Sequence, residues 1–183
     1  MVTLEKYTTD IWPVLSYCTQ HIIRPSGRSP QLTPNNGHYW YLYGQMFYGF
    51  DAYLDLPTYY SEKAQEIYLS LSGPDPIYPD LASVPRSFQT QFDPGRKQLI
   101  YEHMYTGSMF RYDMLQLHLE NRLTVGEVCE LVRRKYAVCW ITREENKLLH
   151  KTRRPDDVFG YYASKGIRIV NAEITMSIPD KAP

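Results

Sequence analysis

The spacing of apolar residues in the first half of the chain predicts helices. Residues 39–55 carry aromatic and apolar side chains every three or four positions, the period of a helix with one buried face. A similar pattern covers 61–71 and begins at Ser61, a residue type that caps helices. Pro57 lies between the two segments, so we expect a helical hairpin over 39–71. A further helix is expected over 11–23.

The second half alternates shorter strand-like and helix-like patterns. Threonine followed three residues later by glutamate, at Thr124 and again at Thr142, is typical of a capping box at a helix start. The run 136–141 is apolar on both faces, as in a central buried strand. In chain order we expect a strand over 98–105, helices over 108–121 and 124–135, the strand 136–141, helices over 142–150 and 155–165, and strands over 167–170 and 172–178.

These elements predict an α+β fold, with a mixed α/β arrangement as the alternative. The N-terminal helical hairpin would accompany a small central sheet flanked by helices in the C-terminal half. A length of 183 residues suits a single domain over 1–183. The proline- and glycine-rich stretch 72–96 marks a possible subdivision into a helical, tyrosine-rich part, 1–94, and an α/β part, 95–183.

Charge supports that subdivision, although the whole chain is formally neutral. Residues 1–94 carry a net charge of −4 and residues 95–183 a net charge of +4, and the basic excess lies mostly between Arg122 and Arg154. The second part therefore presents a possible anion-binding face.

Several classes of protein lose support from what the sequence lacks. It contains no P-loop, dinucleotide-binding, zincin, nucleophile-elbow or EF-hand pattern, and we expect no cofactor and no metal. Its three cysteines form no CxxC pair. No apolar run is long enough to span a bilayer, and the first residues do not resemble a signal peptide. We therefore expect a soluble, cytoplasmic protein without a membrane partner.

One pair of residues suggests catalysis. His103 is a potential general acid or base, and the adjacent Glu102 could orient it. Neighbouring residues of a strand point to opposite faces, however, so the pair serves one site only if the strand ends there. Glu145 is a second acidic candidate, although its place in a capping box explains it equally well. A hydrogen-bonded structural role for His103 is the competing interpretation.

A cationic segment follows the predicted central strand. Side chains spaced by three and four residues share one helix face, and arginines follow directly downstream. The segment would either be a solvated surface or contact the phosphates of nucleic acid. The candidate nucleic-acid-binding residues are Arg143, Lys147, His150, Lys151, Arg153 and Arg154.

Tyrosine is unusually frequent, with 17 residues against 6 phenylalanines. A tyrosine side chain combines a large ring with a polar tip, which suits a core position with the hydroxyl at the surface or a protein interface. The candidate partner-binding residues are Tyr39, Tyr43, Tyr53, Tyr59 and Tyr60.

Two functional hypotheses result. The first is a small interaction protein, such as an inhibitor, an adaptor or a defence-related factor, which binds a protein partner or a second copy of itself through a tyrosine-rich surface. The alternative is a nucleic-acid-acting enzyme, a nuclease or toxin-like phosphodiesterase. It would use His103 with Glu102 or Glu145, and the basic segment 143–154 would hold the phosphates.

Overall fold

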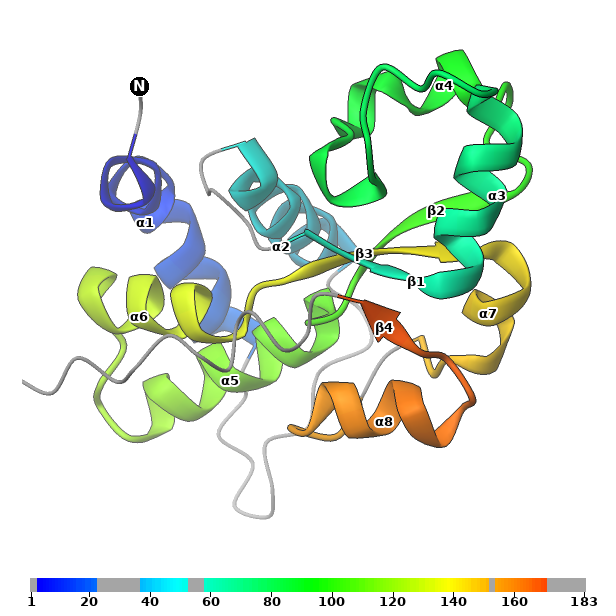
Figure 1. Ribbon diagram of the computed structural model, residues 1–183. Coiled ribbons are helices and arrows are strands. Elements are labelled where there is room, and N and C mark those ends of the chain that lie inside the picture. The colour runs from blue at the N-terminus through cyan, green and yellow to red at the C-terminus, as the bar shows by residue number, and fades with distance from the viewer. Residues whose placement is uncertain (1–2, 23–36, 53–57, 152–153, 171–183) are drawn as a thin grey trace, which may run out of the picture. The chain divides into compact units, whose positions relative to one another are not determined.

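The computed structural model of the chain describes residues 3–22, 37–52, 58–151 and 154–170, and it confirms the α+β class (Figure 1). The chain divides into two compact units. We call residues 1–55 and 106–136 the helical unit, and residues 56–105 and 137–183 the sheet unit. Because each unit combines two separate segments, this division does not follow the subdivision at residue 94. Folding as a single domain stays a prediction.

The helical unit contains helices that pack pairwise around one core. Helix α1 contacts α2, α5 and α6, and α2 also contacts α5. A short 3-10 turn, η1 (Phe50–Ala52), extends α2. The helices are α1 (Leu4–Ile22), α2 (Gly37–Gly49), α5 (Gly107–Leu119) and α6 (Val125–Lys135).

Aromatic rings form the centre of the helical unit. The Phe47 ring centroid lies 5.5 Å from that of Phe110 and 5.0 Å from that of Tyr136, and all three side chains are buried. The Tyr136 hydroxyl has two acceptors for its one proton, the Asp51 carboxylate at 2.7 Å and the Phe47 carbonyl at 3.2 Å. This hydroxyl therefore keeps hydrogen bonds while its ring fills the core.

The N-terminal helices differ from the expected ones in extent and in pairing. Helix α1 begins at Leu4, well before residue 11, and accommodates Pro13 on an exposed part of its surface. The second predicted helix of the hairpin does form and is capped by Ser61, but it belongs to the sheet unit. The N-terminal helical pair is therefore α1 with α2, and the hairpin expected over 39–71 is corrected.

The sheet unit is built on a four-stranded mixed sheet in the order β2-β3-β1-β4. Strand β3 runs parallel to β1 and antiparallel to β2, while β4 runs antiparallel to β1. The strands are β1 (Thr58–Ser61), β2 (Leu99–His103), β3 (Val138–Thr142) and β4 (Ile169–Val170). Around them lie α3 (Glu62–Ser72), η2 (Leu81–Ser83), η3 (Arg86–Phe88), α4 (Gln89–Phe92), α7 (Arg143–Leu148) and α8 (Val158–Ser164).

Helices cover both faces of this sheet, with α3 and α8 on opposite sides (Figure 1). On the α3 side, Tyr60, Leu99 and Trp140 pack with Tyr68 of the helix. On the α8 side, Tyr59, Cys139 and Ile141 pack with Tyr162 and form a second hydrophobic cluster. Strand β3 is buried along all five residues, which confirms the expected central strand.

Helix caps were the most accurate predictions of local structure. The side chains of Ser61, Thr124 and Thr142 each accept a hydrogen bond from the first turn of the helix that follows. Helix α5 is an exception, because Thr106 caps it and Ser108, the expected cap, lies inside it. The strand expected over 172–178 lies outside the described residues.

Candidate functional site

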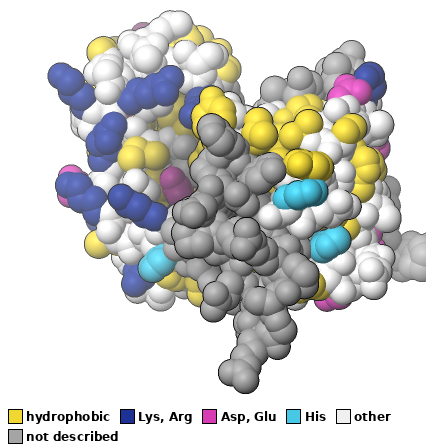
Figure 2. Space-filling view, turned by 180° about the vertical axis from the view of Figure 1, so that it is seen from behind, with side chains coloured by type: hydrophobic (Ala, Val, Ile, Leu, Met, Phe, Trp, Pro, Cys, Tyr) yellow, Lys and Arg dark blue, Asp and Glu magenta, His cyan; other side chains and the backbone are white. Residues whose placement is uncertain are grey.

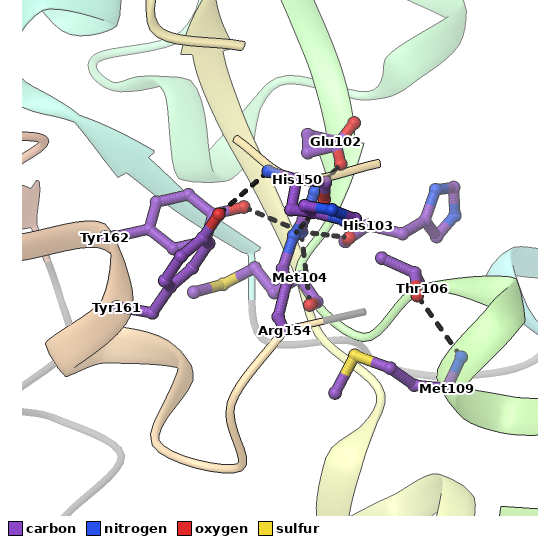
Figure 3. A network of polar contacts seen from close by, with 9 residues as sticks. All are labelled: Glu102, His103, Met104, Thr106, Met109, His150, Arg154, Tyr161 and Tyr162. Atoms are coloured by element: carbon purple, nitrogen blue, oxygen red, sulfur yellow. Dashed lines mark hydrogen bonds and ion pairs between the residues drawn. The ribbon is translucent and has the colours of Figure 1, made fainter. Parts of the chain in front are cut away.

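Glu102 and His103 do not form one site. They occupy the last two positions of β2, and Figure 3 shows the His103 ring pointing away from the Glu102 carboxylate. His103 is buried, 8% exposed, and its ring centroid lies 6.3 Å from that of Tyr101, on the same side of the strand. The alternation of side chains along a strand therefore separates the two candidates, as the sequence analysis anticipated.

Glu102 instead forms an ion pair with Arg154, whose side chain is only 1% exposed. The guanidinium of Arg154 also donates to the main-chain carbonyls of His103, at 2.8 Å, and Met104, at 3.2 Å (Figure 3). It further donates to the Tyr162 hydroxyl at 3.1 Å, and its Nε donates to the His150 carbonyl at 3.3 Å. A buried guanidinium with this many acceptors holds the end of β2 in place.

Burial keeps two side chains in and beside this cluster, Tyr162 and Cys139, in their neutral forms. Burial raises the pKa of the Tyr162 hydroxyl, so this group stays protonated at neutral pH. Burial likewise raises the pKa of the neighbouring Cys139 thiol well above its usual value, and the carboxylates of Glu145 and Glu102 add to this effect. A neutral, buried thiol is a poor nucleophile. We therefore assign the cluster a structural role.

Glu145 is also engaged in structure. Its carboxylate accepts the Thr142 amide at 2.9 Å, and its own amide donates to the Thr142 hydroxyl at 3.0 Å, which completes the predicted capping box. The same carboxylate oxygen accepts the Ser61 hydroxyl at 2.7 Å, and Ser61 in turn caps α3. One buried carboxylate thus links the starts of two helices that follow adjacent parallel strands, β1 and β3.

Most of the predicted nucleic-acid-binding residues are exposed. Arg143, Lys147, His150 and Lys151 all lie at the surface of the sheet unit. Arg154 is the exception, because its buried guanidinium cannot contact a phosphate in this structure, and it is removed from the set. Arg153 lies outside the described residues. Figure 2 shows Lys and Arg side chains gathered on the left of the visible face.

The tyrosines predicted to bind a partner are mostly core residues. Tyr43, Tyr59 and Tyr60 are buried, at 1%, 2% and 9% exposure, so as the chain is folded they are inaccessible and this part of the prediction is corrected. The Tyr39 side chain and Tyr53 lie outside the described part of the chain. The tyrosines that the sequence analysis missed are exposed ones of the helical unit, namely Tyr17, Tyr41, Tyr48 and Tyr112.

Helical phase separates the exposed tyrosines of α2 from the buried one. Tyr41, Gln45 and Tyr48 follow one another at four and three residues and are all exposed, whereas Tyr43, Met46 and Phe47 are buried. The sequence contained this signal, because the two sets fall on different sides of the same helix. It did not reveal which side faces the core.

Neither a candidate metal site nor a candidate membrane span occurs in the described part of the chain. No group of three or more histidine, cysteine, aspartate or glutamate side chains there is placed to hold a metal ion. None of the described helices has the length and apolar character needed to cross a membrane.

Comparison with known proteins finds no matching family, no matching curated protein and no matching solved structure.

Proposed function

We propose that this chain is a non-catalytic interaction protein that binds a protein partner through the exposed face of α2. The observation that supports this proposal is the composition of the helix. Among its thirteen residues α2 has no aspartate, glutamate, lysine or arginine, yet Tyr41 is 66% exposed, Tyr48 52% and Leu42 40%. Protein interfaces are enriched in aromatic side chains and depleted of charge at their centre, as this helix face is.

The partner that this face fits best is a second copy of the chain. Two uncharged surfaces meet without like-charge repulsion, and tyrosines can pack against one another across a two-fold axis while their hydroxyls keep hydrogen bonds. A homodimer would cover apolar surface that a solitary chain leaves in water. Such a protein could serve as an inhibitor, an adaptor or a defence-related factor.

The alternative, a nuclease or toxin-like phosphodiesterase, has weaker support. His103 and Glu102 point to opposite faces of β2, and Glu102 pairs with Arg154. The Glu145 carboxylate already accepts hydrogen bonds from the Ser61 hydroxyl and the Thr142 amide. A general acid–base pair needs both groups within hydrogen-bond reach of one reacting centre, and these three residues do not meet that requirement.

The test compares two lysine variants by sedimentation velocity over a wide range of protein concentration. The first variant, Tyr41→Lys with Tyr48→Lys, places charge on the proposed interface. The matched control, Leu69→Lys with Ile77→Lys, places the same charge at exposed apolar residues of the sheet unit, which are 43% and 75% exposed.

We expect the α2 variant to weaken dimerisation on the order of a hundredfold, because aromatic anchors dominate interface energies. The control should leave dimerisation unchanged. Equal dimerisation of the two variants, or dimerisation weakened only in the control, would overturn the proposed interface.

A further inference from the structure

A loop of the sheet unit holds two cations at the surface in a fixed conformation. The Asp93 carboxylate, 2% exposed, accepts the main-chain amides of Lys97 at 2.9 Å, Gln98 at 3.2 Å and Leu99 at 3.0 Å. These bonds close a turn in which Gly95 and Arg96 have positive φ angles of 76° and 52°. Such a φ is uncommon for a residue other than glycine, so the surrounding bonds determine the position of Arg96.

Helix α7 lies against this loop through its first residue. The Arg143 amide donates to the Gln98 carbonyl at 2.8 Å, and the Arg143 Nε donates to the Arg96 carbonyl at 2.7 Å. With Nε fixed in this way, the two terminal nitrogens of the guanidinium have no hydrogen-bond partner among the described residues. The planar fork of Arg143 is therefore oriented next to Arg96 and open to solvent.

The acidic residues of these two segments do not neutralise this surface. The Asp93 carboxylate is buried and accepts main-chain amides, and Glu145 is buried in the capping box. Glu144 pairs with Lys147 within α7, which leaves Arg96, Lys97, Arg143 and Lys151 without a carboxylate partner among the described residues. We call the resulting surface the cationic edge, and its members are Arg96, Lys97, Arg143, Lys147 and Lys151.

Two features of the cationic edge indicate the chemistry of its ligand. Oriented guanidinium groups match the oxygens of a phosphate in geometry as well as in charge. Of the large apolar side chains on residues 93–98 and 143–151, only Leu148 is exposed, so the aromatic or aliphatic anchors typical of a protein interface are scarce here. Contacts to a nucleic-acid backbone need cations and no apolar core.

We infer that the cationic edge binds the backbone phosphates of a nucleic acid, with Arg96 and Arg143 as its central pair. This inference goes beyond the proposed function and is independent of it, because it concerns a different surface, on the sheet unit. Relative to the predicted nucleic-acid-binding set, the cationic edge adds Arg96 and Lys97 and omits His150, Arg153 and Arg154.

The test measures fluorescence anisotropy of labelled single-stranded DNA, duplex DNA and RNA over a series of salt concentrations. The variant is Arg96→Gln with Arg143→Gln. The matched control is Arg122→Gln with Arg133→Gln, which removes the same charge from two exposed arginines of the helical unit. Those arginines already have carboxylate partners, Glu120 and Glu127 for Arg122 and Glu5 and Glu130 for Arg133.

We expect salt-sensitive binding by the unaltered protein. The Arg96/Arg143 variant should reduce the slope of log affinity against log salt by about 1.4 to 1.8, since each phosphate contact contributes about 0.7 to 0.9. The control should keep the original slope. A second variant, Lys97→Gln with Lys151→Gln, guards against misfolding, because these ammonium groups make no hydrogen bond with the described residues. It too should flatten the slope.

Three results would overturn the inference. The first is the absence of salt-sensitive binding to any of the nucleic acids. The second is an equal loss of binding in the cationic-edge variants and the control. The third is polyglutamate displacing the oligonucleotide as effectively as unlabelled oligonucleotide does, which would indicate a carboxylate-bearing partner. None of these results depends on whether the chain dimerises through α2.

Discussion

The helical unit and the sheet unit differ in the kind of polar side chain that they bury. The buried polar side chains described in the helical unit are threonines, Thr8, Thr19 and Thr106, two of which donate to carbonyls of their own helix. In the sheet unit the described buried set includes Asp93, Glu145 and Arg154. A helix satisfies its own main-chain groups, whereas loops and strand ends need other partners, and these charged side chains supply them.

This difference changes how charged residues should be interpreted in the two units. Each buried charge of the sheet unit is paired with main-chain groups: Asp93 with amides, Arg154 with carbonyls and Glu145 with the amide of Thr142. Two of the catalytic candidates, Glu102 and Glu145, therefore have contacts that hold a strand end and helix starts. The surfaces that we propose to bind a partner, the uncharged face of α2 and the cationic edge, consist instead of exposed side chains.

The largest effect is expected from removing the buried cation of the sheet unit. Arg154→Met leaves the Glu102 carboxylate and the carbonyls of His103 and Met104 without their donor. Breaking a buried ion pair from one side costs about 3 to 5 kcal/mol, so we expect a loss of about 3 kcal/mol in the free energy of unfolding. Urea denaturation measures it. The exposed pair of Arg133 provides the contrast, and Arg133→Met should cost less than about 1 kcal/mol.

If Arg154→Met proved as mild as Arg133→Met, the Arg154 cluster would not be the support of β2 that its contacts indicate.

The two predicted capping boxes, of which only the one at Thr142 is complete, should differ by an intermediate amount in their contribution to stability. Glu145→Ala removes the acceptor of both the Ser61 hydroxyl and the Thr142 amide, and we expect a loss of about 2 kcal/mol. In α6 the corresponding Glu127 is half-buried and pairs with Arg122, while Thr124 caps the helix alone. Glu127→Ala should therefore cost less than about 1 kcal/mol.

Thermal unfolding of the two alanine variants side by side measures this difference. Equal melting temperatures would show that the bond between Ser61 and Glu145 contributes nothing measurable to stability.

The smallest expected effects concern two glycines of α2. A Cβ at Gly49 would overlap the Tyr7 hydroxyl, which donates to the Met46 carbonyl at 2.9 Å, whereas a Cβ at Gly44 would meet nothing within 4 Å. Gly49→Ala should destabilise by about 1 to 2 kcal/mol through overpacking. Gly44→Ala should stabilise by about 0.5 to 1 kcal/mol, because alanine favours a helix. Chemical denaturation of both variants checks whether they shift in opposite directions.

Local signals in the sequence were sufficient for much of the fold. A cap followed by a periodic apolar pattern located α3 and α6, a capping box located α7, and an uninterrupted apolar run located β3. Strand β1 was missed because its four residues, which directly follow Pro57 and end with the α3 cap Ser61, are too few to show a strand pattern. Its strand character depends on pairing with β3, some eighty residues later in the chain.

The candidate sites were harder to predict because they depend on burial and on distant contacts. Nothing local distinguishes the buried Arg154 from the exposed Lys151, since the difference lies in the contacts of Arg154 with the end of β2. Arg96 likewise adjoins Arg143 only through the fold. Sequence alone identified a cationic segment over 143–154. It did not reveal that Arg154 is buried or that Arg96 lies beside Arg143.

The proposed pairing of the exposed, uncharged face of α2 with a second copy of the chain can be tested directly. The most direct measurement is the molar mass of the unaltered protein by light scattering during size-exclusion chromatography, repeated over a wide range of loading concentrations. We expect twice the mass of one chain at high concentration, decreasing toward the mass of one chain on dilution. The mass of a single chain at every concentration would contradict it.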